Sequence, residues 1–220
     1  YADADYCVAK GRETYGYEYA MHFPWHEWPA GRDKKLSPVH DKVRELGGQM
    51  GAVSGWERAN WFAQDGDDTS HEATQTWDRA GPWEPRMRAE CEAVRDGVGV
   101  LDLPGFSRFS LSGDGAAEWL RAMICGALPK VGRMNLGYFA DRRGRILSEM
   151  SIIRSAEDGF VLITAATAEW HDFQMLQKHL GKGLRLLNRT RIFGTLIVTG
   201  PKSRELLAKI GAADLSLPWL

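Results

Sequence analysis

Hydrophobic and polar positions alternate regularly after about residue 80, and this period of two predicts β-strands. Short breaks that contain glycine, proline or aspartate separate the alternating runs, as turns do between strands. The predicted strands cover residues 98–103, 106–111, 136–139, 146–153, 160–164, 184–187 and 194–198. The basic tip at 141–145 is interpreted as a solvated hairpin turn in preference to an anion-binding site, with Gly144 supplying a positive φ.

A spacing of three or four residues between apolar positions predicts four helices in the same part of the chain. They cover residues 83–95, 114–125, 169–180 and 203–210. Asp114 is the expected N-cap of the second helix, because its carboxylate can accept hydrogen bonds from the first free backbone amides. Strands and helices in this order predict an α+β fold, with a mixed, largely antiparallel sheet and packed helices.

The first 80 residues differ in character, since they are rich in aromatic residues and show few clean strand patterns. Their tryptophans are Trp25, Trp28, Trp56, Trp61 and Trp77. A short helix is predicted within 36–48, with Ser37 as its N-cap and Gly47 as the residue that ends it. This change in character predicts two domains, 1–80 and 81–220.

Composition and charge exclude several classes of function. With 220 residues, 44% of them hydrophobic and 26% charged, the chain has the composition of an ordinary globular protein. A formal net charge of -1 gives no electrostatic footprint for nucleic acid or an anionic membrane, and no apolar run is long enough to span a bilayer. No Gly-x-Gly-x-x-Gly fingerprint follows a strand, so no nucleotide-binding module is predicted within these residues.

The spacing of cysteines and histidines predicts neither a disulfide framework nor a metal site. Cys7, Cys91 and Cys125 are odd in number and far apart, and the last two fall in helical apolar patterns typical of buried thiols. His22 and His26 are four residues apart, as two ligands on a helix are, but a proline lies between them and no third ligand is evident. Packing among neighbouring aromatic residues is the favoured interpretation of both histidines.

Glu149 is the carboxylate that the strand pattern singles out. Alternation places Glu149 on one face with Leu147 and Ser151, opposite the more apolar face that carries Ile146, Met150 and Ile152. The more apolar face is the expected core face. An exposed strand position and a functional carboxylate both fit Glu149, and the pattern alone favours the exposed position.

Two sets of residues resemble known families. Residues 15–32, 36–48 and 55–63, the last reading Gly-Trp-Glu-Arg-Ala-Asn-Trp-Phe-Ala, are similar to the linker domain of dimethylglycine and sarcosine dehydrogenases. Residues 100–108, 137–149 and 198–201 are similar to the start of the folate-binding fold of the glycine cleavage aminomethyltransferase, the T-protein. Their order matches the C-terminal half of the dehydrogenases, so the chain resembles an internal fragment of an FAD-dependent N-methyl amine oxidoreductase.

The resemblance implies a folate site around Glu149. This residue falls where the family has an aspartate that contacts tetrahydrofolate and helps methylene transfer, so Glu149 is the expected catalytic residue. Phe106 and Leu136 fall where apolar side chains pack against the folate. Tyr138 and Leu162 complete the expected cofactor-binding set, and no metal is expected.

The resemblance also implies a parent enzyme with two cofactors, tetrahydrofolate and an FAD bound by a domain outside this chain. That enzyme demethylates an N-methyl amine such as dimethylglycine or sarcosine and passes the one-carbon unit to folate. Its expected partners are the small-molecule amine, folate, and the rest of the parent polypeptide or a flavin subunit, without nucleic acid or membrane. The bacterial cytoplasm is the preferred compartment, with the mitochondrial matrix as the other choice.

Two alternative functions stay open. The first is a folate-dependent aminomethyltransferase that works without flavin, although the T-protein lacks the segment before residue 80. The second is a non-catalytic binding module with the folate fold. Two departures from the family favour it: Ala166 stands where the T-protein has an asparagine, and a glutamate replaces the aspartate at position 149.

Overall fold

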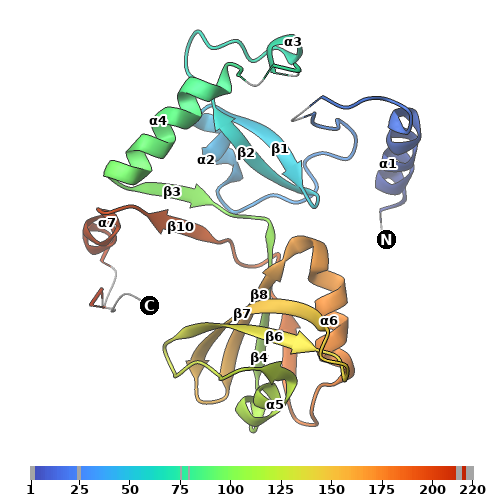
Figure 1. Ribbon diagram of the computed structural model, residues 1–220, viewed down its shortest axis with the longest axis vertical. Coiled ribbons are helices and arrows are strands. Elements are labelled where there is room, and N and C mark those ends of the chain that lie inside the picture. The colour runs from blue at the N-terminus through green and yellow to red at the C-terminus, as the bar shows by residue number, and fades with distance from the viewer. Residues whose placement is uncertain (1–2, 24–25, 75, 79, 212–214, 217–220) are drawn as a thin grey trace. The chain divides into compact units, whose positions relative to one another are not determined.

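The computed structural model describes residues 3–23, 26–74, 76–78, 80–211 and 215–216, and it divides the chain into two compact units (Figure 1). Unit 1 comprises Tyr1–Pro104 and Thr195–Leu220, and unit 2 comprises Gly105–Gly194. The predicted domain boundary near residue 80 follows a change in the composition of the sequence. The two units follow compactness, which is a different criterion, so this boundary stays a prediction. Pro24 and Trp25 lie outside the described residues.

Unit 1 contains two small antiparallel sheets and several helices. One sheet pairs β1 (Gly48–Val53) with β2 (Trp56–Phe62), and the other pairs β3 (Gly99–Asp102) with β10 (Leu196–Thr199). The helices are α1 (Ala4–Tyr17), α2 (His40–Glu45), α3 (His71–Thr74), α4 (Trp83–Asp96) and α7 (Ser203–Lys209). The turn between β1 and β2 has positive φ at Ser54 (54°) and Gly55 (79°), as the type I′ two-residue hairpin turn requires.

Helix α2 lacks the N-cap that the sequence predicts. It begins at His40 after Val39, and no side chain caps it. The Ser37 hydroxyl instead donates to the Asp102 carboxylate at 2.5 Å. The prediction of Ser37 as the cap is therefore wrong, because the helix begins three residues after Ser37, whose hydroxyl bonds to a residue 65 positions away.

A partly buried ion pair ties the segment before α2 to strand β2. The Arg32 guanidinium donates to both carboxylate oxygens of Glu57, at 2.8 and 2.5 Å, and the Asp33 N–H donates to Glu57 Oε1 at 2.9 Å. Glu57 is only 2% exposed. Burial opposes ionisation of this carboxyl, but the hydrogen bonds from Arg32 and Asp33 outweigh it and hold the pKa of Glu57 below its usual value.

Unit 2 is a six-stranded antiparallel sheet in the order β5-β6-β7-β8-β4-β9. The strands are β4 (Phe106–Ser112), β5 (Ile124–Cys125), β6 (Met134–Ala140), β7 (Ile146–Ala156), β8 (Gly159–Ala165) and β9 (Arg185–Asn188). Its helices are α5 (Ala116–Met123), α6 (Glu169–Lys178) and the 3-10 turn η1 (Ala166–Ala168). The predicted α+β class with a largely antiparallel sheet is thereby confirmed.

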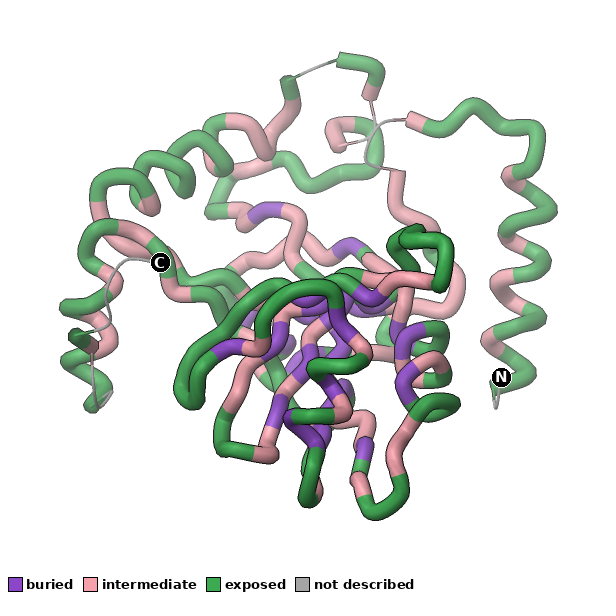
Figure 2. Tube along the Cα trace, turned by 60° about the horizontal axis from the view of Figure 1, so that its bottom comes forward, coloured by how far each residue is buried: buried purple, intermediate pink, exposed green. Residues whose placement is uncertain are grey.

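The core of unit 2 lies on one face of this sheet, where strand residues meet α5 and α6. Figure 2 marks the buried positions along the trace in purple. Phe109, Phe139, Met150 and Leu162 come from four neighbouring strands and are almost completely buried. Leu120 of α5 and Leu176 of α6 are fully buried in the same cluster. The predicted core face of β7 is confirmed at Met150 and Ile152, which are buried whereas Leu147 and Glu149 are exposed. It is wrong at Ile146, which is 66% exposed at the first position of the strand.

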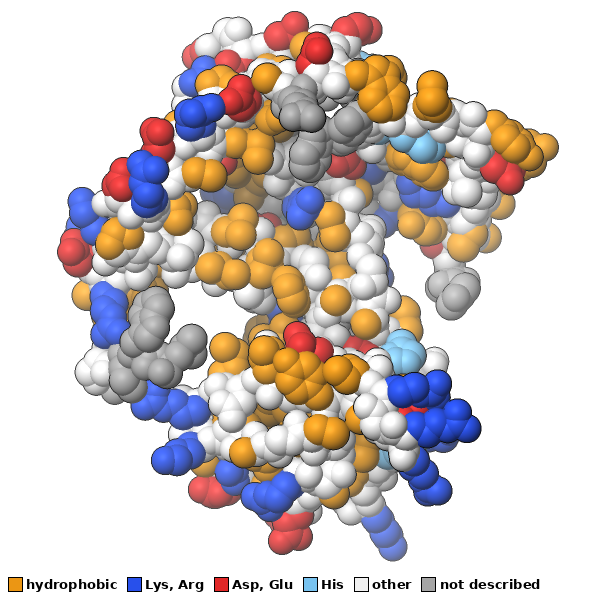
Figure 3. Space-filling model, in the orientation of Figure 1, with side chains coloured by type: hydrophobic (Ala, Val, Ile, Leu, Met, Phe, Trp, Pro, Cys, Tyr) orange, Lys and Arg blue, Asp and Glu red, His pale blue; other side chains and the backbone are white. Residues whose placement is uncertain are grey.

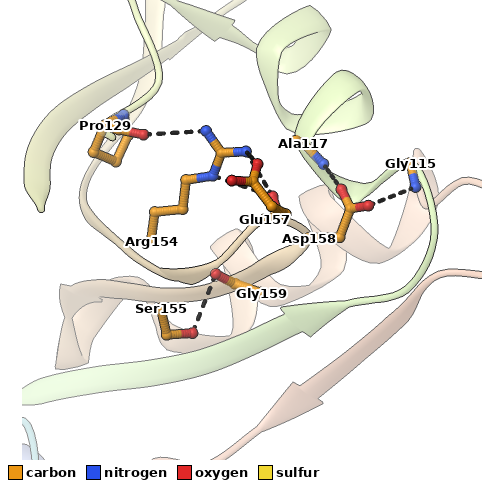
Figure 4. A network of polar contacts seen from close by, with 8 residues as sticks. All are labelled: Gly115, Ala117, Pro129, Arg154, Ser155, Glu157, Asp158 and Gly159. Carbon is orange, nitrogen blue, oxygen red and sulfur yellow. Dashed lines mark hydrogen bonds and ion pairs between the residues drawn. The ribbon is translucent and has the colours of Figure 1, made fainter. Parts of the chain in front are cut away.

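The N-terminus of α5 is capped from the β7–β8 turn (Figure 4). The Asp158 carboxylate accepts hydrogen bonds from the backbone N–H groups of Gly115 at 3.3 Å and Ala117 at 2.9 Å. In the same turn Arg154 donates to the Glu157 carbonyl and carboxylate, at 2.7 and 2.8 Å. Asp114 is exposed and forms no cap, so the predicted cap is wrong, and the residue that caps α5 lies about forty positions further along the chain.

We expect Asp158→Ala to lower the free energy of unfolding of unit 2 by about 1 kcal/mol, the usual cost of losing an N-cap. Asp114→Ala is the matched control, since it removes the same group beside the same helix without breaking a cap. Urea denaturation followed by circular dichroism measures both variants. A larger loss for Asp114→Ala than for Asp158→Ala would contradict the assignment of the cap.

The cysteines correct a further prediction. Cys7, Cys91 and Cys125 are free and exposed, so the expectation that Cys91 and Cys125 are buried is wrong. Cys91 lies on α4, a helix without a fully buried residue, and Cys125 lies in the short edge strand β5.

Among the helices of the described ranges, none is both long and apolar enough to cross a membrane.

Candidate functional site

Glu149 lies near the start of β7, on the face of the sheet opposite the core of unit 2. The strand register places Tyr138 of β6 directly opposite Glu149, with both side chains on this outward face. A hydrogen bond from the Tyr138 hydroxyl to the Glu149 carboxylate raises the pKa of the tyrosine above its usual value. Glu149 is thus an exposed carboxylate with a phenol as its neighbour.

Apolar side chains flank this pair on the same face. Leu136 is 55% exposed and pairs with Ser151, which pairs in turn with Ile163 of β8. Phe106, partly buried at the start of β4, pairs with Ala165, two residues beyond Ile163 on the same side of β8. In the view of Figure 3, hydrophobic side chains gather on unit 2 between groups of Lys and Arg.

Leu162 does not belong to this face. It is fully buried in the core cluster, because neighbouring residues of a strand point to opposite faces. The structure therefore brings together Phe106, Leu136, Tyr138 and Glu149 of the expected set and separates Leu162 from them. Ile163 occupies the outward position on β8, and only the pairing register, which one sequence does not reveal, distinguishes it from Leu162.

A buried polar network lies on the reverse side of the strand that carries Glu149. Ser148, the preceding residue, donates its hydroxyl to Asp172 of α6 at 2.9 Å. Thr164 of β8 donates to the same oxygen at 2.5 Å, and His171 Nδ1 lies 2.9 Å from the other oxygen. Asp172 is fully buried. These hydrogen bonds fix β7 and β8 to α6, so the backbone beneath Glu149 is held firmly.

The histidines near the N-terminus pack among aromatic rings, as the sequence predicts. Tyr17 lies 5.6 Å from the ring of His22 and 5.2 Å from that of His26, measured between ring centroids. Trp28 stacks beside Tyr17 at 5.2 Å and beside His22 at 5.4 Å. The two histidine Nδ1 atoms are 3.4 Å apart. This is the geometry of an aromatic cluster.

The tip of the β6–β7 hairpin is a tight, exposed turn. Asp141 accepts hydrogen bonds from the backbone N–H groups of Arg143 and Arg145, and from Arg145 Nε at 2.8 Å. Gly144 adopts a φ of 77°, the positive value expected there. The arginines of the tip thus stand in solvent around an internally satisfied turn, in agreement with the favoured interpretation.

Comparisons with known proteins match this fold. A family model described as "GCVT N-terminal domain" matches residues 39–219, and one described as "FAD dependent oxidoreductase central domain" matches residues 1–37. The chain therefore belongs to the GCVT N-terminal domain family, preceded by a segment of the FAD-dependent oxidoreductase central domain.

Two curated relatives cover nearly the whole chain. The mitochondrial dimethylglycine dehydrogenase of Rattus norvegicus is 31% identical over 214 residues, which are 96% of this chain and 25% of the relative. The 4-methylaminobutanoate oxidase (formaldehyde-forming) of Paenarthrobacter nicotinovorans is also 31% identical over 214 residues, 96% of this chain and 26% of the relative. The chain thus spans about a quarter of the length of these relatives.

A solved structure shares the fold. The glycine cleavage system aminomethyltransferase T from Bartonella henselae superimposes with a TM-score of 0.65 and 21% sequence identity. The match covers 84% of this chain and 46% of that structure. At this identity the likeness establishes a T-protein-like fold.

Proposed function

We propose that the chain is part of an FAD-dependent dehydrogenase or oxidase that demethylates an N-methyl amine, such as dimethylglycine or sarcosine, and passes the one-carbon unit to tetrahydrofolate. The observation that carries this proposal is the 31% identity to dimethylglycine dehydrogenase over 96% of the chain. The order of the two family matches supports it, because a flavin-enzyme segment precedes a GCVT domain.

Side chains on the outward face of unit 2 support the folate part of the proposal. A pterin is a flat ring system with N–H donors at its edge, and such a group needs apolar contact and an acceptor. Phe106, Leu136 and Ile163 offer the apolar contact, and the exposed carboxylate of Glu149 offers the acceptor. Leu162 is left out of the proposed contacts because it is buried in the core.

Bound flavin would supply hydride removal from the N-methyl carbon, and bound tetrahydrofolate would supply the amine that accepts the one-carbon unit. Glu149 would accept a hydrogen bond from that amine and take up its proton as the new nitrogen–carbon bond forms. Tyr138 would hold the Glu149 carboxylate in place through its hydroxyl. The network of Ser148 and Asp172 would keep the strand beneath them rigid.

The remaining parts of the proposal concern the parent enzyme. FAD is assigned to a part of the polypeptide, or to a flavin subunit, that lies outside this chain. The bacterial cytoplasm is the preferred compartment over the mitochondrial matrix. The name of one relative includes formaldehyde formation, so release of the one-carbon unit as formaldehyde is the competing outcome.

An activity assay of the full polypeptide that contains this chain tests the proposal. The purified protein is examined for flavin absorbance and then mixed with dimethylglycine or sarcosine, with and without tetrahydrofolate. We expect the amine to bleach the flavin, and the yield of methylene-tetrahydrofolate to match the amine oxidised. A protein without flavin that still transfers a one-carbon unit would favour the aminomethyltransferase, and one with neither activity nor folate affinity would favour the non-catalytic module.

A further inference from the structure

Unit 1 contains a pocket of about 310 Å³ beside the β1–β2 hairpin. Its lining comes from both strands of the hairpin, from the segment around α3 and from the first residue of α4. Glu27 contributes a carboxylate to this lining. No residue of the proposed folate site takes part in it, so the pocket requires an explanation of its own.

The Glu27 carboxylate is held in place by the hairpin. Asn60 Nδ2 donates to Glu27 Oε1 at 2.7 Å, and the Ala52 N–H donates to Glu27 Oε2 at 3.0 Å. A Cβ atom at Gly51 would collide with Glu27 Oε1 and with Asn60 Nδ2. The lack of a side chain at this glycine of β1 therefore leaves the space that the Glu27 carboxylate occupies.

The charge of Glu27 is not neutralised by its hydrogen bonds, because both donors are uncharged groups. A carboxylate has about four acceptor positions, so two stay available. Arg32 interacts electrostatically with Glu27, but its guanidinium donates to Glu57. Of the described residues that line the pocket, none is a lysine or an arginine, and the basic one is His71. A half-buried negative charge here favours a cationic ligand.

The walls of the pocket suit a methylated or alkylated cation. Trp61, Trp83 and Met50 are among the residues that line it. Trp61 is only 6% exposed, so its ring is a fixed surface. Aromatic faces attract an ammonium ion through their quadrupole while they contact its methyl groups. A ligand for this pocket needs a positive charge for Glu27 and alkyl groups for the aromatic residues. Organic cations no larger than a lysine side chain provide both.

We infer that this pocket binds a small alkylammonium ion, with its N–H directed at Glu27 and its alkyl groups against Trp61 and Trp83. The inference stands on the pocket alone and does not depend on the proposed folate chemistry. It assigns to unit 1 a binding role for free amines.

Calorimetric titration of the purified chain tests the inference with two probes of the same shape. N,N-dimethylethanolamine is protonated at neutral pH, and 3-methylbutan-1-ol replaces its N–H by C–H. We expect the cation to bind the chain at least tenfold more tightly than the alcohol, since only the cation can pair with Glu27. We expect Glu27→Gln to remove this difference, because the amide keeps the shape but loses the charge.

Glu45→Gln is the matched control, because Glu45 lies in unit 1 with its side chain 63% exposed and lines no part of the pocket. It should bind the cation as the unchanged chain does. Gly51→Ala is a second variant, which should displace the carboxylate and weaken cation binding. Equal affinity of the unchanged chain for the cation and the alcohol would overturn the inference without any variant. Unchanged cation binding by folded Glu27→Gln would overturn it as well.

Discussion

Methylene transfer should fall by at least about 100-fold when Glu149 is replaced by alanine in the intact enzyme, the usual size of a lost general acid–base contribution. Amine oxidation should continue at its normal rate, because the flavin chemistry is assigned to another part of the parent. The one-carbon unit should then leave as formaldehyde. The measurement is the yield of methylene-tetrahydrofolate and of formaldehyde per amine oxidised.

Two variants make this result specific. Glu149→Asp should keep most of the methylene transfer, because the T-protein family that this chain resembles has an aspartate at this position. Glu157→Ala removes a carboxylate that is 85% exposed beyond the far end of β7, and it should leave both yields unchanged. An unaltered yield of methylene-tetrahydrofolate in Glu149→Ala would end the catalytic role of this residue.

The second large effect concerns stability. We expect Glu57→Gln to lower the free energy of unfolding of unit 1 by about 3 kcal/mol, because it leaves the Arg32 guanidinium without its anionic partner. The loss should shrink at low pH. The pKa of Glu57 is depressed in the folded chain, so its contribution is complete above the unfolded-state value and disappears as the pH falls through the folded-state value.

Urea denaturation followed by tryptophan fluorescence measures this effect. Most tryptophans belong to unit 1, whereas unit 2 has Trp119 and Trp170, so the signal reports mainly on unit 1. Glu45→Gln is the control, since it breaks the exposed pair with Lys42 and should cost only about 0.3 kcal/mol. Similar losses for the two glutamates would show that burial of the Arg32 pair adds nothing.

The sequence predicts unit 2 well because its strands are half-buried. A strand with one face in the core must alternate, so the pattern identifies both the strand and its outward face, as with Glu149 and Met150. Strands β1 and β2 escaped prediction because their burial does not alternate in this way. Trp56 and Glu57 are neighbours, and both are buried, the second through its ion pair with Arg32.

The failures share a physical cause, which is contact between residues distant in the sequence. Asp114 and Ser37 are suitable caps by local rules, but Asp158 caps α5, and Ser37 bonds to Asp102. The sequence predicts Leu162 among the cofactor-binding residues, whereas the register of β8 buries Leu162 and turns Ile163 outward instead. A single sequence carries no record of these pairings, although each decides which polar group is satisfied and which side chain faces a ligand.

The alternation along β7 has a consequence for how this protein can change over generations. Glu149 faces outward and Met150 is buried, so under the proposed function adjacent codons serve two separate demands, folate contact and core packing. A substitution at an outward position can therefore change the outward face without changing the packing of the core. A one-codon insertion or deletion in this strand would reverse both faces at once, placing a carboxylate in the core and a thioether at the ligand. Variation in length should consequently be confined to the loops around β7, and ligand preference should drift by substitution at outward positions alone.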